Sequence, residues 1–116
     1  MSSIFDPYFA KSPTLKLLRS PSACFVLGFF YVSFKEEGLT QIPEEDLEAL
    51  LDRHLQDARA ADPDAMPRDA RFYLNQWCEE SHRLLQKRFV EAQNSYVYQL
   101  TQFSEKALAW VEDLRR

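Results

Sequence analysis

The sequence predicts a mostly α-helical domain that carries one small β-hairpin, which is an α+β fold. An apolar stripe with helical spacing runs from Leu47 to Ala58, and the apolar period changes from about four to two between Leu84 and Leu100. Helical spacing returns after Thr101. The chain has 116 residues, of which 46% are hydrophobic and 14% aromatic, so we expect one domain with a well-packed core.

The most clearly patterned segment covers residues 42–61. Its apolar residues recur at i, i+3, i+4, i+8 and i+11 and lie on one face of a helix: Leu47, Leu50, Leu51, Leu55 and Ala58. Pro43 suits a first helical turn because it lacks the N–H that such a turn leaves unpaired. The three carboxylates that follow it stabilise the positive end of the helix dipole. We therefore expect the central helix here.

Four segments precede the central helix. Residues 1–11 are too short for a helix and too aromatic for a free tail, so we expect an arm that packs on a neighbouring surface. Ser12 and Pro13 begin a short helix that ends near residue 20. A second helix, residues 22–36, is apolar around nearly its whole circumference and must be buried on more than one side. Gly38 ends it, and residues 39–42 can form a short strand.

The remaining segments complete a known arrangement. A helix is predicted from Met66-Pro67 to Trp77, and a hairpin from Leu84 to Leu100 with Asn94 as the left-handed residue of its loop. Thr101 or Ser104 caps a last helix with one apolar face, formed by Phe103, Ala107, Trp110, Val111 and Leu114. This order is that of a winged helix-turn-helix domain, which we expect to span residues 12–116. No stop signal follows Leu114, so we expect a piece of a longer protein.

Few residues could support catalysis. His54 and His82 lie in separate elements without metal-site spacing, and we expect His54 on a helix surface. Two glycines are too few for a nucleotide-binding loop. We therefore expect no enzymatic activity, no metal and no cofactor. Cys24 and Cys78 are expected to be reduced thiols of a cytoplasmic protein, with a disulfide between them as the alternative. The apolar run 23–32 is about half of a membrane span, so we expect no membrane association.

The basic residues indicate only a weak DNA site. Arg68, Arg71, Lys87 and Arg88 lie on the second helix of the pair and on the hairpin, where winged helices contact DNA. The net charge is −4, however, and proteins that grip phosphates are usually basic. Contact with another protein is the favoured alternative, because exposed aromatic patches usually mark interfaces.

A homodimer is the expected form of this contact. The candidate interface residues are the aromatic side chains of the arm and of helix 22–36: Phe5, Tyr8, Phe9, Phe25, Phe29 and Phe30. The alternative for the three phenylalanines of the helix is burial in the core of the chain.

Several stretches together resemble a known family. They are Leu17-Leu18-Arg19-Ser20, the helix Leu47 to Leu55, Phe72-Tyr73-Leu74 with Trp77, Tyr98-Gln99-Leu100-Thr101, and Glu105-Lys106-Ala107-Leu108-Ala109-Trp110-Val111-Glu112. Their order and spacing resemble the N-terminal region of the JetA and MksF kleisin-like subunits, which are similar to MukF. The resemblance covers nearly all of residues 12–116, and the last two stretches are its most specific part.

The resemblance implies a non-catalytic subunit whose full-length form bridges the two ends of an SMC-type ATPase and its accessory subunits. Its N-terminal winged-helix domain would pair two copies. In Wadjet systems, the assembled complex extrudes DNA loops and a nuclease partner cleaves small plasmids, which is anti-plasmid defence. In the MksBEF condensins, the relatives act in chromosome organisation. A winged-helix regulator that binds DNA directly remains the alternative from another class.

Overall fold

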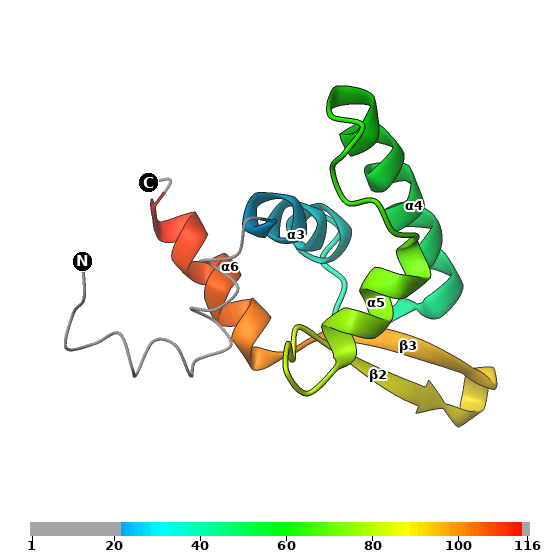
Figure 1. The fold of residues 1–116 in the computed structure, drawn as a ribbon. Coiled ribbons are helices and arrows are strands. Elements are labelled where there is room, and N and C mark those ends of the chain that lie inside the picture. The colour runs from blue at the N-terminus through cyan, green and yellow to red at the C-terminus, as the bar shows by residue number, and fades with distance from the viewer. Residues whose placement is uncertain (1–21, 115–116) are drawn as a thin grey trace.

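The computed structural model describes residues 22–114, which form helices around a three-stranded antiparallel sheet (Figure 1). The α+β class predicted from the sequence is confirmed at this level. The predicted arm and the helix at 12–20 lie outside the described residues. The elements in chain order are α3 (Ala23–Phe30), the π-helical η1 (Tyr31–Lys35), β1 (Ile42–Pro43), α4 (Glu44–Ala61), α5 (Ala70–Cys78), β2 (Leu85–Val90), the 3-10 turn η2 (Glu91–Gln93), β3 (Ser95–Leu100) and α6 (Gln102–Leu114).

The predicted helix at 22–36 changes its winding partway along. It is α-helical as far as Phe30 and continues as a π-helix to Lys35, where the N–H of Glu36 donates to the carbonyl of Tyr31. The wider turn places Ser33 and Phe34 in the interior. Gly38 then takes a left-handed conformation with φ +65°, as predicted from its position after the helix.

The buried side of the central helix α4 follows its sequence pattern, but Pro43 is the N-cap and a residue of β1 and does not lie in the first helical turn as predicted. Leu47, Leu51 and Leu55 are buried, while Leu50 is half-buried at the edge of the stripe. The preceding strand β1 is shorter than expected, with two residues only. Its partner is β3, where Ile42 pairs with Tyr98.

The next helix, α5, begins later than predicted. Pro67 does not start it; instead the side chain of Asp69 accepts a hydrogen bond of 2.8 Å from the N–H of Phe72 and forms the N-cap. Before the cap, the Arg59 guanidinium donates to the carbonyls of Met66 and Arg68, which ties the connecting loop to the end of α4. The α4–α5 pair is therefore joined by a loop with its own hydrogen bonds.

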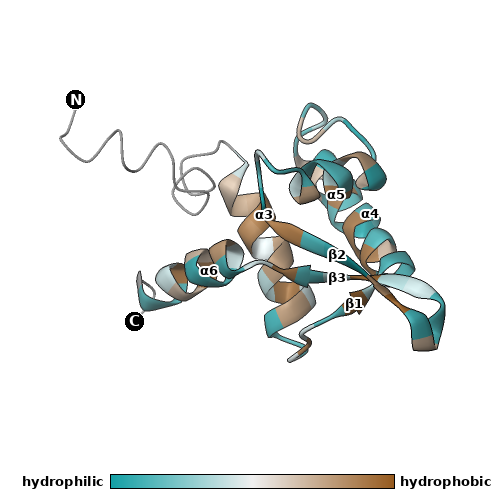
Figure 2. Ribbon diagram, turned by 90° about the horizontal axis from the view of Figure 1, so that it is seen from below, coloured by the Kyte–Doolittle hydropathy of each residue, from teal (hydrophilic) through white to brown (hydrophobic). Residues whose placement is uncertain are grey.

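The predicted hairpin is confirmed. Strand β3 lies in the middle of the sheet, with β1 and β2 on either side, and Leu85 pairs with Leu100. Asn94 has φ 50°, the left-handed conformation expected of it. In Figures 1 and 2 the hairpin extends away from α6, so its turn lies at the opposite end of the molecule.

The helices and the sheet share one aromatic-rich core. Trp77 stands at its centre, with its ring 5.4 Å from Phe30 and 6.1 Å from Tyr73. Helix α6 closes the core through small residues. Ser104, Ala107 and Leu108 are buried, and the Ser104 hydroxyl donates to the carbonyl of Leu84 at 2.7 Å. The predicted apolar face of this helix is thus wrong in one important respect, because Trp110 is 50% exposed.

Candidate functional site

The aromatic residues predicted for a dimer interface divide into three groups. Phe29 and Phe30 are 1% and 0% exposed, and their rings pack on Trp77 within the same chain. They therefore have no surface to offer to a second copy, which corrects their place among the candidates. Phe25 is half-buried at the edge of the core. Phe5, Tyr8 and Phe9 lie outside the described residues.

The structure shows instead an apolar outer face on α3 and η1. Cys24, Gly28 and Val32 are exposed and recur every fourth residue, so they line one side of the helix. Phe25 and Tyr31 flank them as half-buried side chains. We call these five residues the α3 face. The sequence contains no charged residue from position 22 to 34, and Figure 2 shows α3 coloured hydrophobic along most of its length.

Gly28 is an unusual residue for the middle of this face. A Cβ added at this position would meet no atom within 4 Å, and its backbone is not left-handed. Gly in a helix interior is less favourable than Ala by about 0.8–1.0 kcal/mol. Neither packing nor backbone conformation within the described chain explains it. The absence of charge along the segment was the sequence signal for this face, but an all-apolar helix does not reveal which side stays uncovered.

The predicted DNA-contact residues do not form an open basic patch. Two of them are paired with carboxylates of α4: Arg71 lies 3.4 Å from Glu48, and the Lys87 ammonium lies 2.6 Å from Glu44. The Arg68 guanidinium stacks over the Phe72 ring at 4.1 Å. The fourth residue, Arg88, is exposed on β2.

Burial at the junction of α5 and the sheet suppresses ionisation. Desolvation raises the pKa of the Cys78 thiol, and the nearby Lys87 ammonium offsets part of this rise. Desolvation also raises the pKa of Tyr98, with smaller contributions in the same direction from Cys78, Glu44 and Glu48, while Arg71 lowers it. Both groups are therefore neutral at pH 7. Cys24 and Cys78 are free thiols.

The sequence pattern predicted His54 on the surface of α4, but its side chain does not lie free there. Its ring is half-buried and stands edge-on to Phe29, with 5.1 Å between the ring centroids, and its Nδ1 lies 3.1 Å from the carbonyl oxygen of Leu50. It is a packing residue at the edge of the core.

Within residues 22–114, no group of three or more His, Cys, Asp or Glu side chains could hold a metal ion. None of the helices in this range has the length and apolar character that crossing a membrane requires.

Comparison with known proteins places the chain in a family. It is 29% identical over 106 residues to an uncharacterised protein of Mycolicibacterium smegmatis, and the aligned part covers 90% of this chain but 22% of that protein. The chain thus spans about a fifth of the length of this relative. No solved structure shows a significant match. The model of a family described as a protein of unknown function, DUF3375, matches residues 8–116, so the chain belongs to the DUF3375 family.

Proposed function

We propose that the domain is a winged helix. The order of α3, β1, α4, α5, β2 and β3 supports this proposal, because a winged helix has this succession of helix, short strand, helix pair and hairpin. The three-stranded sheet with β3 in its middle also agrees with it. The β2–β3 hairpin is then the wing, and α5 occupies the position of the recognition helix.

We further propose that the chain is the N-terminal dimerisation domain of a non-catalytic, kleisin-like subunit of a cytoplasmic SMC-type complex. The resemblance to the JetA and MksF subunits supports this function, and anti-plasmid defence of the Wadjet type is the role that we favour. The observation that carries the proposal is the α3 face, an uncharged strip that the described chain leaves exposed. Large exposed apolar patches on soluble domains mark interfaces.

The chemistry of the α3 face fits a second copy of the same helix. A two-fold contact is self-complementary, so two α3 helices would cross each other with Gly28 near the crossing point. A glycine at that point allows two backbones to approach closely, which would account for a residue that nothing in the described chain requires. A stable interface buries about 800 Å² per partner, and α3 together with its flanking side chains is the starting point for an area of that size.

The experiment is sedimentation equilibrium of the 116-residue chain at micromolar concentration. We expect a dimer for the wild type. Val32→Glu places a charge in the interface on both sides and should raise the dimer Kd at least about tenfold, the factor produced by 1.4 kcal/mol. Ala60→Glu is the matched control, because it adds the same charge at an exposed position on α4. A monomeric wild type, or equal weakening by both substitutions, would contradict the proposal.

The role of the parent protein requires a test in cells. In Wadjet-type defence, deleting its gene should increase the retention of a small circular plasmid, and a gene for a nuclease subunit should lie beside it. For an MksBEF-type subunit, the deletion should disturb chromosome segregation and leave plasmid retention unchanged. The two outcomes separate the favoured role from its alternative.

A further inference from the structure

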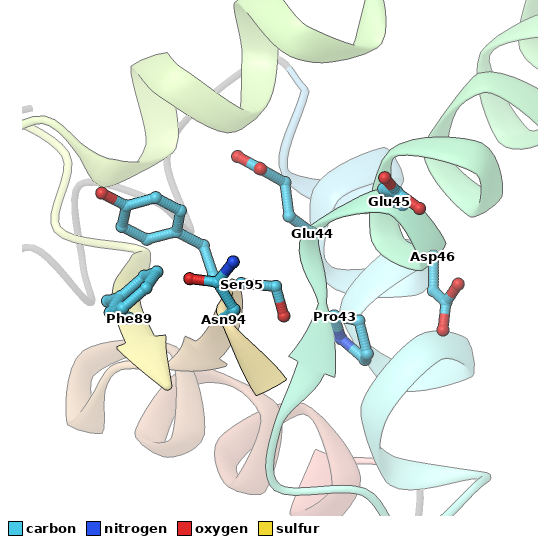
Figure 3. Close-up of a pocket in the computed structure, with 8 residues that line it drawn as sticks. Pro43, Glu44, Glu45, Asp46, Phe89, Asn94 and Ser95 are labelled. Atoms are coloured by element: carbon cyan, nitrogen blue, oxygen red, sulfur yellow. The ribbon is translucent and has the colours of Figure 1, made fainter. Parts of the chain in front are cut away.

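A hollow lies between the turn of the hairpin and the start of α4 (Figure 3). It has a volume of about 370 Å³ and takes residues from both elements: Pro43, Glu44, Glu45, Asp46, Phe89, Asn94, Ser95 and Tyr96. One side is aromatic and the other is acidic. The hollow shares no residue with the α3 face, so the following inference does not depend on dimerisation.

The aromatic side is formed by Phe89 and Tyr96, which pair across β2 and β3. Their rings meet edge to face with centroids 5.1 Å apart. They are nevertheless 47% and 44% exposed, whereas the next pair on the same face of the hairpin, Lys87 with Tyr98, includes the buried Tyr98. Two large rings thus remain in water at the end of a hairpin that has already contributed its inner residues to the core. An exposed aromatic pair beside a concave surface is typical of a protein-binding site.

The acidic side determines the sign of the charge that the hollow attracts. Glu44, Glu45 and Asp46 contribute three negative charges, against one from Lys87 and about half a positive charge from the α4 dipole. Glu45 and Asp46 are exposed, and within the described residues neither has an ion-pair partner. The remaining charge is negative. Phosphates are therefore repelled, and cations are attracted.

The chain already holds one cation in this manner. The Lys87 ammonium lies 4.8 Å from the centroid of the Tyr96 ring and 2.6 Å from a carboxylate oxygen of Glu44. A cation over an aromatic face beside a carboxylate is a favourable arrangement, worth about 0.5–2 kcal/mol for the aromatic part alone. Phe89, the second ring of the pair, has no such contact with a cation of the described chain, and Glu45 and Asp46 lie on the far side of Pro43 and Glu44 from this ring (Figure 3).

We propose that this hollow binds a lysine or arginine side chain from a basic segment of a partner protein. The cation lies against the exposed Phe89 ring, and the negative charges of Glu45 and Asp46 attract it from the far side of the hollow. A second copy of this chain is a poor occupant, because a two-fold contact would bring one acidic rim against the other. The charge of the hollow makes nucleic acid a poor occupant as well.

The test is NMR titration of the uniformly ¹⁵N-labelled 116-residue chain. The probe is the peptide acetyl-Arg-Leu-Arg-Gly amide, and its counterpart with citrulline in place of both arginines keeps the shape but removes the charge. The arginine peptide should shift the amides of Phe89, Ser95 and Tyr96, and the citrulline peptide should not. Raising the salt concentration should weaken binding by screening.

Variants with matched controls locate the site. Phe89→Leu keeps an apolar side chain but removes the ring, and should raise the peptide Kd about 2- to 30-fold, the range of a cation–π contact. Glu45→Gln with Asp46→Asn should weaken binding in the same direction. Trp110→Leu, an equally exposed aromatic on α6, and Glu112→Gln with Asp113→Asn, which changes the charge equally, should leave the Kd unchanged.

Four results would overturn the proposal. The first is equal binding of the citrulline peptide, and the second is an unchanged Kd for Phe89→Leu when its urea midpoint shows an intact fold. The third is a 12-base-pair DNA duplex that shifts the same amides more strongly than the peptide, which would assign the hollow to nucleic acid. The fourth is loss of dimerisation in Phe89→Leu, which would assign it to a second copy.

Discussion

At the scale of single residues, the two glycines of this chain have opposite roles. Gly28 is helical with open space around it, so Gly28→Ala should raise the free energy of unfolding of the monomer by about 1 kcal/mol. Gly38 has φ +65°, so Gly38→Ala should lower it by a similar amount, about 1 kcal/mol. Urea denaturation at concentrations where the chain is monomeric measures both. Destabilisation by Gly28→Ala would show that the described structure lacks a neighbour of this residue.

The buried titratable groups predict the alkaline behaviour. Because the pKa of Cys78 is raised in the folded state, its contribution to stability is fully present below the pKa of an unfolded thiol, about 8.5, and is lost as the pH rises through the folded value. Cys78→Ser removes this titration, so the fall of the urea midpoint between about pH 8 and pH 10 should become shallower. Cys24→Ser is the control, because Cys24 is exposed. Equal slopes for the two variants would contradict this assignment.

At the scale of elements, the start of α5 depends on one carboxylate. The Asp69 carboxylate accepts a hydrogen bond from the N–H of Phe72, so Asp69→Ala should lower the free energy of unfolding by about 1 kcal/mol. Asp69→Asn should retain most of the stability of the wild type, because Asn is also a good N-cap residue. Thermal unfolding of the three chains checks this order. Asp57→Ala, at an exposed position within α4, is the control and should change stability by less than about 0.5 kcal/mol.

The elements also show how far sequence patterns reach. The α4 stripe was predicted because one side of the helix faces the core, so the period of apolar residues records the burial of Leu47, Leu51 and Leu55 directly. The hairpin was predicted from its alternating residues, although the adjacent Val97 and Tyr98 are both buried. The buried face of α6 was not predicted correctly, because it carries small residues. The hydroxyl of one of them, Ser104, donates a hydrogen bond to a carbonyl of a distant segment. A pattern weighted by large side chains selects Trp110 instead.

The same limit applies to the candidate sites. In α3 every position is apolar or small, so the sequence predicted an interface somewhere on the helix but not which side was open, and Phe29 and Phe30 proved to be core. The aromatic and acidic sides of the hollow are between 43 (89 − 46) and 52 (96 − 44) residues apart in the chain and meet only because β1 pairs with β3, which puts the start of α4 beside the hairpin. Spacing along the chain carries no record of that contact.

At the scale of the whole molecule, charge pairing rather than charge content opposes DNA binding. The chain has 14 basic and 18 acidic residues, and two of the cations at the expected DNA-binding positions, Arg71 and Lys87, are held by Glu48 and Glu44. Each exposed pair is worth at most about 1 kcal/mol, so releasing a cation should require only the loss of its carboxylate.

This gives a direct test of the DNA-binding alternative. The double variant Glu44→Gln with Glu48→Gln changes the net charge from −4 to −2, since 14 − 16 = −2, and frees both cations. Gel-shift titration should give the wild type only weak binding to a duplex, while the variant gains up to about fivefold for each freed cation. Its slope of log K against log salt should steepen by up to about 1.8, because each phosphate contact adds about 0.9.

Glu36→Gln with Glu37→Gln gives the same net charge at a remote, exposed site and is the control. Equal gains in both double variants would attribute the effect to net charge alone, and tight, steeply salt-dependent binding by the wild type would favour the DNA-binding regulator over the kleisin-like subunit.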